Sequence, residues 1–263
     1  MKLFPDDRSR MLPQHPATDR RPAFRRDLRR SVDLFAAFRL EQSDPDRAAA
    51  STSLLGQWVD LAGAVVVDIG GGPGYFCEAF ERAGSRYAGV EPDAGELTAH
   101  GAPGGIAVRG SGLELPFGDG CADVAFSSNV LEHVPDPVRM AEEMLRITRR
   151  GGLVFLSWTP WLSPHGGHET GMWHYLGGRR AADRYAARHG HRPKNDFGRS
   201  LFACPVGPMV QWARDEERAG RVEVLDVFAR YHPTWAQWVM RVPGLREFAS
   251  WNAVIVLRVR ADG

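Results

Sequence analysis

The chain is poor in several features that would assign a protein to a class at once. Its three cysteines, Cys77, Cys121 and Cys204, include no C-x-x-C spacing, which argues against a disulfide framework or a thiolate zinc site and favours buried thiols in a reducing cytoplasm. No apolar run approaches the length of a membrane span, and none follows the charged N-terminus, so neither a span nor an export signal is expected. The net charge is only +1, which disfavours a nucleic acid substrate.

Lysine is also scarce, since it stands only at positions 2 and 194. Arginines supply the remaining positive charge, and a local basic block contains Arg20, Arg21, Arg25, Arg26, Arg29 and Arg30. This block has two interpretations, a solvated helix start or an anion-binding segment. With 263 residues, the chain fits one α/β domain with additions.

The pattern of apolar residues predicts an α/β fold with a doubly wound, mostly parallel sheet of seven strands. Strands are expected over residues 65–69, 87–91, 106–109, 122–127, 153–158, 222–228 and 253–259. Helices are expected over residues 44–60, 76–83, 136–151 and 206–218, with an earlier one through Leu28, Val32 and Phe35 and a Trp-rich helical segment over 234–251. Asp136 and Pro137 form the N-cap and first-turn pair of the third of these helices.

A glycine-rich segment, VVVDIGGGPGYF at residues 65 to 76, is the strongest local signal. A buried strand runs into a turn whose glycines let backbone approach a ligand. Gly70, Gly72 and Gly74 form G-x-G-x-G, followed by Tyr75, whereas dinucleotide sites have G-x-G-x-x-G. The next apolar run ends in an acidic residue, Glu91. This pattern is typical of proteins that bind S-adenosylmethionine.

A second segment, GLELPFGDGCADVAFSSNVLEHVPDP at residues 112 to 137, extends the likeness. With the glycine loop, it resembles the core of class I S-adenosylmethionine-dependent methyltransferases of type 11. The specific motifs cover residues 60 to 158, and the rest of the chain resembles, more loosely, a group of uncharacterised actinobacterial methyltransferases. The resemblance implies a Rossmann-like domain over 27–263 after a loose basic segment at 1–26. Within the domain we expect N-terminal helices at 27–62, the cofactor core at 63–158, a lid or substrate insertion at 159–204 and the C-terminal strands at 205–263.

The same resemblance implies S-adenosylmethionine as the cofactor and a set of residues that hold it. The glycine loop faces its methionine part, Asp68 organises the loop, and Glu91 accepts both ribose hydroxyls. Many relatives carry an acid at the adenine position, where this chain has a serine and neighbouring backbone. The expected cofactor residues are Asp68, Gly70, Gly71, Gly72, Gly74, Glu91, Ser111, Gly112, Leu113 and Asn129.

Catalytic candidates come from the histidines. His133 follows the fourth strand and is expected either to act as a base on a hydroxyl acceptor or to have only a structural role, in which it caps the following helix or bonds to backbone. The segment SPHGGHETGMWHYLGG, residues 163 to 178, favours substrate recognition and closure, with His168, Trp173, His174 and Tyr175 as substrate residues. A metal site from His165, His168 and Glu169 is disfavoured because their spacing matches no helical zinc motif.

We therefore expect an enzyme that methylates a small molecule, glycoside or glycolipid, most simply at oxygen. The alternatives are transfer to nitrogen or carbon, methylation of RNA or protein, and a non-catalytic scaffold that binds S-adenosylmethionine. No obligate protein partner is indicated. Trp235, Trp238, Val239 and Val242 recur at helical spacing beside Arg241, which is typical either of core or of a surface that contacts the inner face of a membrane.

Overall fold

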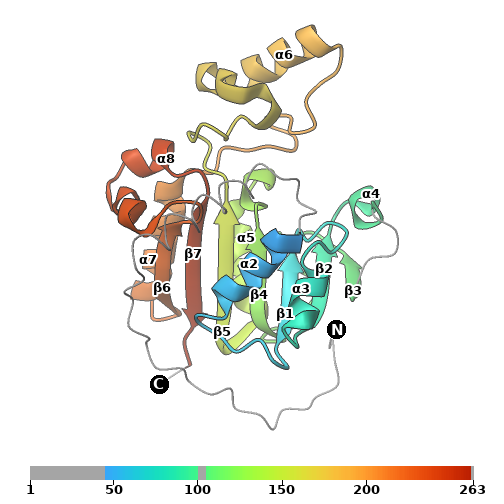
Figure 1. The fold of residues 1–263 in the computed structure, drawn as a ribbon, viewed down its shortest axis with the longest axis vertical. Helices are drawn as coiled ribbons and strands as arrows, with labels where there is room; N and C mark the ends of the chain where they lie inside the picture. The colour runs from blue at the N-terminus through green and yellow to red at the C-terminus, as the bar shows by residue number, and fades with distance from the viewer. Residues whose placement is uncertain (1–44, 100–104, 262–263) are drawn as a thin grey trace. The chain divides into compact units, whose positions relative to one another are not determined.

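Figure 1 shows the protein as a computed structural model, which describes residues 45–99 and 105–261. The expected helix through Leu28, Val32 and Phe35, the segment 1–26 and the arginine block lie outside the described residues. Among the helices that are described, none is both long and apolar enough to cross a bilayer.

The sheet has seven strands in the order β3-β2-β1-β4-β5-β7-β6 (Figure 1). Its strands are β1 (Val65–Ile69), β2 (Arg86–Glu91), β3 (Ile106–Arg109), β4 (Ala122–Ser128), β5 (Thr148–Trp158), β6 (Val222–Ala229) and β7 (Ala253–Val259). Strand β1 pairs in parallel with both β2 and β4, so the strand order reverses there. The predicted doubly wound, mostly parallel sheet is confirmed. Loops at the carboxyl ends of β1 and β2 are where such folds bind ligands.

Helices and 3₁₀ segments connect these strands. They are α2 (Pro45–Leu55), α3 (Cys77–Arg82), α4 (Ala94–Leu97), η1 (Leu131–His133), α5 (Pro137–Ile147), η2 (His168–Leu176), α6 (Gly178–His189), α7 (Val206–Arg218), η3 (Thr234–Arg241) and α8 (Leu245–Ala249). The carboxylate of Asp136 accepts a hydrogen bond from the backbone of Arg139 at 2.9 Å. The predicted N-cap is confirmed.

The chain groups into two compact units. Of the described residues, the first contains 45–99, 105–126, 143–154 and 258–261, and the second contains 127–142 and 155–257. In the described part of the first unit, α3 packs on β2 and α2 packs on α3. The ring of Phe126 lies edge-on to those of Phe76 and Phe80, at 5.0 and 5.3 Å. These apolar contacts fix the helix that follows the glycine loop.

Arg146 holds the Leu-Pro-Phe segment of the first unit against α5. Its guanidinium donates to the backbone oxygens of Leu115 and Phe117 at 3.0 and 2.9 Å and to the carboxylate of Glu143 at 2.7 Å. Glu143 in turn accepts from the backbone N–H of Leu115 at 2.8 Å. The arginine and the glutamate thus satisfy the backbone of a segment without regular structure.

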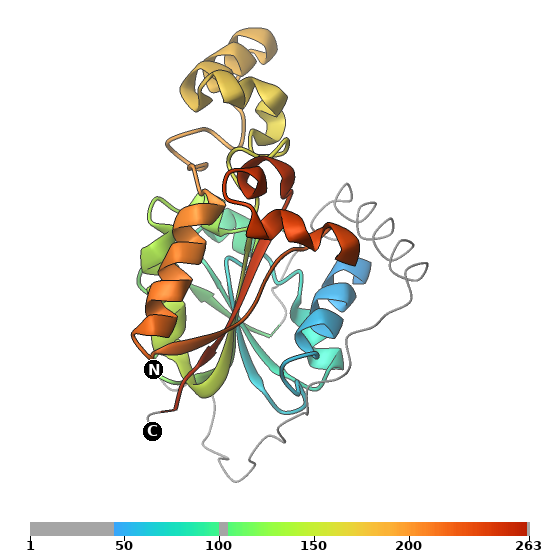
Figure 2. The ribbon, with the colours of Figure 1, turned by 90° about the vertical axis from the view of Figure 1, so that its left-hand side faces the viewer.

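In the second unit, α7 packs on β6, and Figure 2 shows this helix beside the strand. Residues 159–204 contain η2 and α6, which pack on each other. Buried Trp158 donates from its indole nitrogen to the backbone oxygen of Cys204 at 3.1 Å. This bond joins the end of β5 to the end of the insertion.

Two predicted helix ends are wrong. Helix α2 ends at Leu55 rather than residue 60, and α5 ends at Ile147 rather than residue 151, because β5 already begins at Thr148. A Cβ on Gly152 would lie 2.8 Å from the backbone oxygen of Asp123 on β4. A glycine at this position therefore lets the start of β5 lie close to β4. The cysteines are free thiols; Cys77 and Cys204 are buried, as expected, whereas Cys121 is partly exposed.

Candidate active site

The glycine loop of the first unit has the backbone geometry that its sequence predicts. Gly70, Gly72 and Gly74 have φ of 75°, 54° and 89°, the left-handed region that favours glycine. Gly71 is required for space, because a Cβ there would lie 2.7 Å from the Asp68 carboxylate. The loop therefore exposes backbone where side chains would block a ligand.

Asp68 lies under this loop and is buried. Its carboxylate accepts a hydrogen bond of 2.7 Å from the hydroxyl of Tyr87, a partner on β2 that the sequence interpretation missed. Burial raises the pKa of Asp68 to about 7, although the bond from Tyr87 opposes the shift. The role of Asp68 in organising the loop stays a prediction.

Glu91 ends β2 and lies against the glycine loop. One carboxylate oxygen accepts from the backbone N–H of Gly72 at 3.2 Å, and the other from that of Asp93 at 3.1 Å. Burial raises the pKa of Glu91, and these two bonds oppose the shift. Each carboxylate oxygen can accept one more hydrogen bond, so the oriented carboxylate of Glu91 can accept from a pair of hydroxyl groups.

The predicted adenine segment follows β3 in the same unit. The hydroxyl oxygen of Ser111 accepts from the backbone N–H of Leu113 at 3.2 Å, which closes a tight turn. Gly112 is buried within this turn, whereas Ser111 is exposed. The Ser111 hydroxyl can still donate its own proton.

Asn129, the remaining cofactor candidate, belongs to the second unit. It has a positive φ of 60°. Its backbone N–H donates to the backbone oxygen of Ser157 at 2.8 Å, and its side-chain oxygen accepts from Asn252 at 2.6 Å. These bonds fix the turn at the end of β4.

The second unit also brings two histidines and a glutamate together. The rings of His133 and His168 lie edge to face with their centres 5.3 Å apart. Glu132 is buried beside them and was not among the expected site residues. Burial lowers the pKa of His168, although the charge of Glu132 opposes the shift. A cluster of this kind can handle a proton or bind a cation.

The other predicted substrate residues have different environments. His174 is buried and its Nδ1 lies 2.7 Å from the backbone oxygen of Gly171, a placement that favours a packing role. The Tyr175 hydroxyl donates to the backbone oxygen of Leu162 at 2.9 Å. Trp173 is 46% exposed, with the Arg184 guanidinium 3.7 Å from its ring centre.

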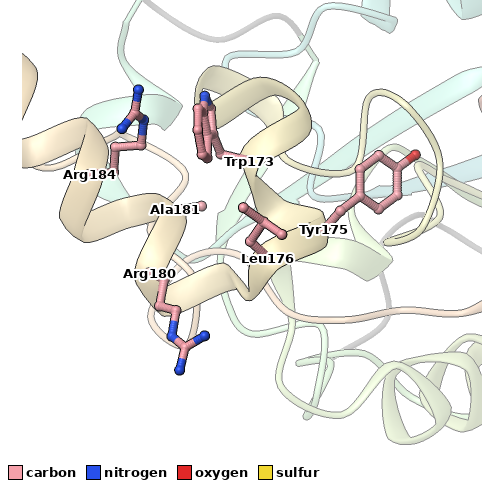
Figure 3. Close-up of a pocket in the computed structure, with 6 residues that line it drawn as sticks. All are labelled: Trp173, Tyr175, Leu176, Arg180, Ala181 and Arg184. Carbon is pink, nitrogen blue, oxygen red and sulfur yellow. The ribbon is translucent and has the colours of Figure 1, made fainter.

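Figure 3 shows a hollow beside Trp173 on the surface of the second unit. Its volume is about 460 Å³. Aromatic and aliphatic side chains line it together with two arginines, and the lining residues are Trp173, Tyr175, Leu176, Arg180, Ala181 and Arg184. Such a hollow suits a molecule with an apolar part and an anionic or polar part.

The fold and the glycine loop with its acidic partner are those of an S-adenosylmethionine-dependent methyltransferase, and comparisons with known proteins agree. The methyltransferase domain family matches residues 67–156. A relative from Mycobacterium sp. (strain KMS) is 53% identical over 90% of this chain and 97% of its own length. One from Mycobacterium tuberculosis (strain H37Ra) is 50% identical over 89% and 96%. Both are named uncharacterized methyltransferase.

The chain belongs to this methyltransferase family, and S-adenosylmethionine is its cofactor. The solved structure of an S-adenosylmethionine-dependent methyltransferase from Mesorhizobium loti shares the fold, with a TM-score of 0.54 and 22% identity over 81% of this chain and 99% of that one. A structure from Listeria monocytogenes gives a TM-score of 0.53. The resemblance inferred from the sequence motifs is confirmed.

Substitution of Gly71 tests the steric fit of the loop. We expect Gly71→Ala to abolish measurable binding of S-adenosylmethionine in calorimetry, because the new methyl group displaces Asp68 and the Tyr87 hydroxyl, which would lie 2.9 Å away. The same overpacking lowers the free energy of unfolding by about 1 to 3 kcal/mol. Gly118→Ala is the control, since its Cβ meets nothing within 4 Å. Equal affinities for the two variants would contradict the steric argument.

The raised pKa of Asp68 predicts a pH dependence of stability. Native Asp68 keeps its proton up to about pH 7, whereas its pKa without the fold is 3.8. Between these values the native state binds the additional proton, so the free energy of unfolding falls as pH rises from about 4 to about 7. Asp68→Asn removes this contribution. Urea unfolding at several pH values measures it, and parallel profiles for the variant and the wild type would refute the assignment.

Proposed function

We propose that this enzyme transfers a methyl group to a hydroxyl oxygen of a small amphiphilic acceptor, such as a glycoside or a glycolipid. The observation that carries the proposal is a surface of the second unit, on which η2, η3 and α8 expose apolar side chains and α6 exposes arginines. The histidine pair of the same unit supports an acceptor that must lose a proton.

The residues of the first unit fit the cofactor. The loop at Gly70, Gly71, Gly72 and Gly74 leaves room for backbone contact, and Glu91 is held by two backbone donors in an orientation that suits the ribose diol. Ser111, Gly112 and Leu113 are assigned to adenine and Asp68 to the loop, whereas the contact expected from Asn129, a residue of the second unit, stays a prediction. When bound, S-adenosylmethionine supplies an electrophilic methyl group on its sulfonium sulfur.

His133 is assigned to the acceptor proton. Its Nδ1 lies 2.7 Å from the backbone oxygen of Ser200. A carbonyl only accepts, so Nδ1 carries the proton and Nε2 keeps a free lone pair. That nitrogen can accept or orient the proton of a hydroxyl. A nitrogen or carbon acceptor needs no such residue when it carries no acidic proton.

Two variants test whether Glu91 binds the cofactor and whether His133 acts on the acceptor. We expect Glu91→Ala to weaken binding of S-adenosylmethionine by about 1 to 3 kcal/mol, because charged hydrogen bonds are lost. We expect His133→Ala to leave that affinity unchanged and to lower turnover by about 10² to 10⁴ fold. Calorimetry and turnover measurements check both effects.

Two controls make this comparison specific. Glu223→Gln changes an exposed glutamate on β6 and His189→Ala an exposed histidine on α6, and neither should alter either quantity. Unchanged turnover in His133→Ala would refute its role and favour transfer to nitrogen or carbon. Binding without transfer to any acceptor would favour the scaffold alternative.

Exposed large apolar side chains gather on few segments. All those found among the described residues belong to the second unit, on η2 or on the η3–α8 segment; they are Met172, Trp173, Leu176, Trp235, Trp238, Val242, Leu245 and Phe248. The rings of Tyr175 and Phe248 stack at 6.5 Å, so the two segments meet. Single exposed apolar residues are ordinary, but a group of this kind marks an interaction site.

Arginines beside this group indicate what it contacts. Helix α6 exposes Arg179, Arg180, Arg184 and Arg188, and no ion pair joins them to carboxylates in the described ranges 45–99 and 105–261. Tryptophan with arginine is typical of protein surfaces at the boundary of a lipid bilayer. We assign this surface to an anionic lipid membrane, from which a lipid-linked acceptor would be taken. The core alternative is confirmed for Val239, which is buried, and is wrong for Trp235 and Trp238, which are 58% and 52% exposed.

Sedimentation with vesicles tests this surface. We expect the protein to bind vesicles that contain an anionic lipid more tightly than neutral ones, because the arginines add about 1 kcal/mol each near a charged surface. Trp235→Ala with Trp238→Ala should weaken binding to both kinds of vesicle. Arg180→Ala with Arg184→Ala should remove the preference for anionic lipid, while Arg214→Ala with Arg218→Ala on α7 should retain it. No binding by the intact protein would refute the membrane assignment.

A further inference from the structure

Three side chains of the second unit bring ligand-type atoms together. Glu132 and His133 lie on η1, and His168 begins η2. One donor atom from each residue lies within 4.8 Å of the other two. A carboxylate and two imidazoles are a ligand set for divalent transition metals such as Zn²⁺.

Hydrogen bonds prepare both histidines as ligands. Nδ1 of His168 lies 3.2 Å from the backbone oxygen of Gly166, and Nδ1 of His133 bonds to that of Ser200. Because a carbonyl only accepts, each Nδ1 carries the proton, and each Nε2 has its lone pair available. Histidines that bind metals are commonly oriented by such a bond from the other ring nitrogen.

Glu132 is the buried member of this cluster. It is only 1% exposed. One carboxylate oxygen accepts from the backbone N–H of Thr159 at 3.0 Å, but the other is buried and has no hydrogen-bond partner among the described residues. An unsatisfied oxygen of this kind is costly, and a cation would satisfy it.

The backbone around His168 is constrained in a way that fixes the imidazole. His168 has a φ of 48°, which is uncommon for a residue with a side chain. The preceding glycines pack closely: a Cβ on Gly166 would overlap the backbone of Trp161, and one on Gly167 would overlap that of Gly171. Strained backbone held by its surroundings is frequent at ligand sites.

We propose that Glu132, His133 and His168 bind one divalent transition metal ion, with Zn²⁺ as the best match. Three protein ligands leave a coordination position for water or for an acceptor oxygen. Such an ion would lower the pKa of a bound hydroxyl, whose proton would then pass to solvent water, because Nε2 of His133 would hold the metal and could not accept it. This last consequence rests on the proposed methyl transfer to oxygen, whereas metal binding does not.

The site differs from the set considered from the sequence. Glu169 accepts from the side chain of Asn195 at 2.9 Å, and the ring of His165 packs against Trp251 at 5.7 Å. His168 is the residue common to both sets. His165 is therefore a matched control: a histidine of the same segment that the proposal leaves out.

Metal titration tests the proposal without any methyl acceptor. The purified protein is treated with a chelator, dialysed, and titrated with Zn²⁺ against a competing indicator and with Co²⁺ by visible absorption. We expect one ion per chain and a Co²⁺ spectrum that differs from that of the free ion. His133→Gln and His168→Asn should weaken binding at least about tenfold, while His165→Asn should leave it unchanged. Asparagine is chosen at 168 because it tolerates positive φ.

Calorimetry with S-adenosylmethionine on each variant separates this test from that of the proposed function. Retained cofactor affinity together with lost Zn²⁺ affinity supports the site whether or not an acceptor is methylated. Absence of Zn²⁺ and Co²⁺ binding by the wild type would overturn the proposal. Binding that is equally strong in His168→Asn would also overturn it, because the ion would then lie elsewhere.

Discussion

The close approach of the glycine loop to the pair formed by Asp68 and Tyr87 is the constraint on which the cofactor site depends. The tyrosine hydroxyl and the carboxylate occupy the space that a side chain at position 71 would need. Parallel pairing of β1 and β2 sets Asp68 opposite Gly89 and Ile69 opposite Val90. The same register ends β2 at Glu91, whose carboxylate then accepts the backbone N–H of Gly72. The register between β1 and β2 therefore also determines how the glycine loop packs.

Packing also defines the insertion of the second unit. Of its five glycines between residues 163 and 178, Gly171 and Gly177 have positive φ, whereas Gly166, Gly167 and Gly178 lie where a Cβ would overlap neighbouring atoms. The glycines therefore serve turns and close contacts, and they fix His168 in place. The closure predicted for this segment stays a prediction, and the packing favours a preformed surface.

The sequence predicts well those features that arise from local patterns and from strand order. Strands β1, β3 and β7 and helix α7 have the predicted bounds, since apolar runs and flanking glycines mark them. The end of α5 was missed because pairing in the sheet overrides helix propensity after Ile147. Helix α6 was also missed, although its alanines and arginines and the left-handed Gly190 after its end are helix signals.

The site was predicted unevenly for a similar reason. The glycine loop and Glu91 are one strand apart, so a parallel register brings them together without further information. Tyr87 and Glu132 gain their importance from tertiary contacts: one meets Asp68 across the sheet, and the other lies beside His168, thirty-six residues away. Four of the eight exposed apolar residues were named from the sequence, but the meeting of η2 with the η3–α8 segment was not predicted, because it depends on tertiary packing.

The proposed reaction transfers the methyl group of S-adenosylmethionine to an oxygen of an amphiphilic small molecule. The most direct measurement incubates the protein with S-adenosylmethionine carrying a labelled methyl group and an extract of its native organism. The extract is then partitioned, and the labelled product is identified by mass spectrometry. We expect label in a solvent-extractable molecule as an O-methyl group. Label in protein, in RNA or on a nitrogen or carbon atom would contradict it.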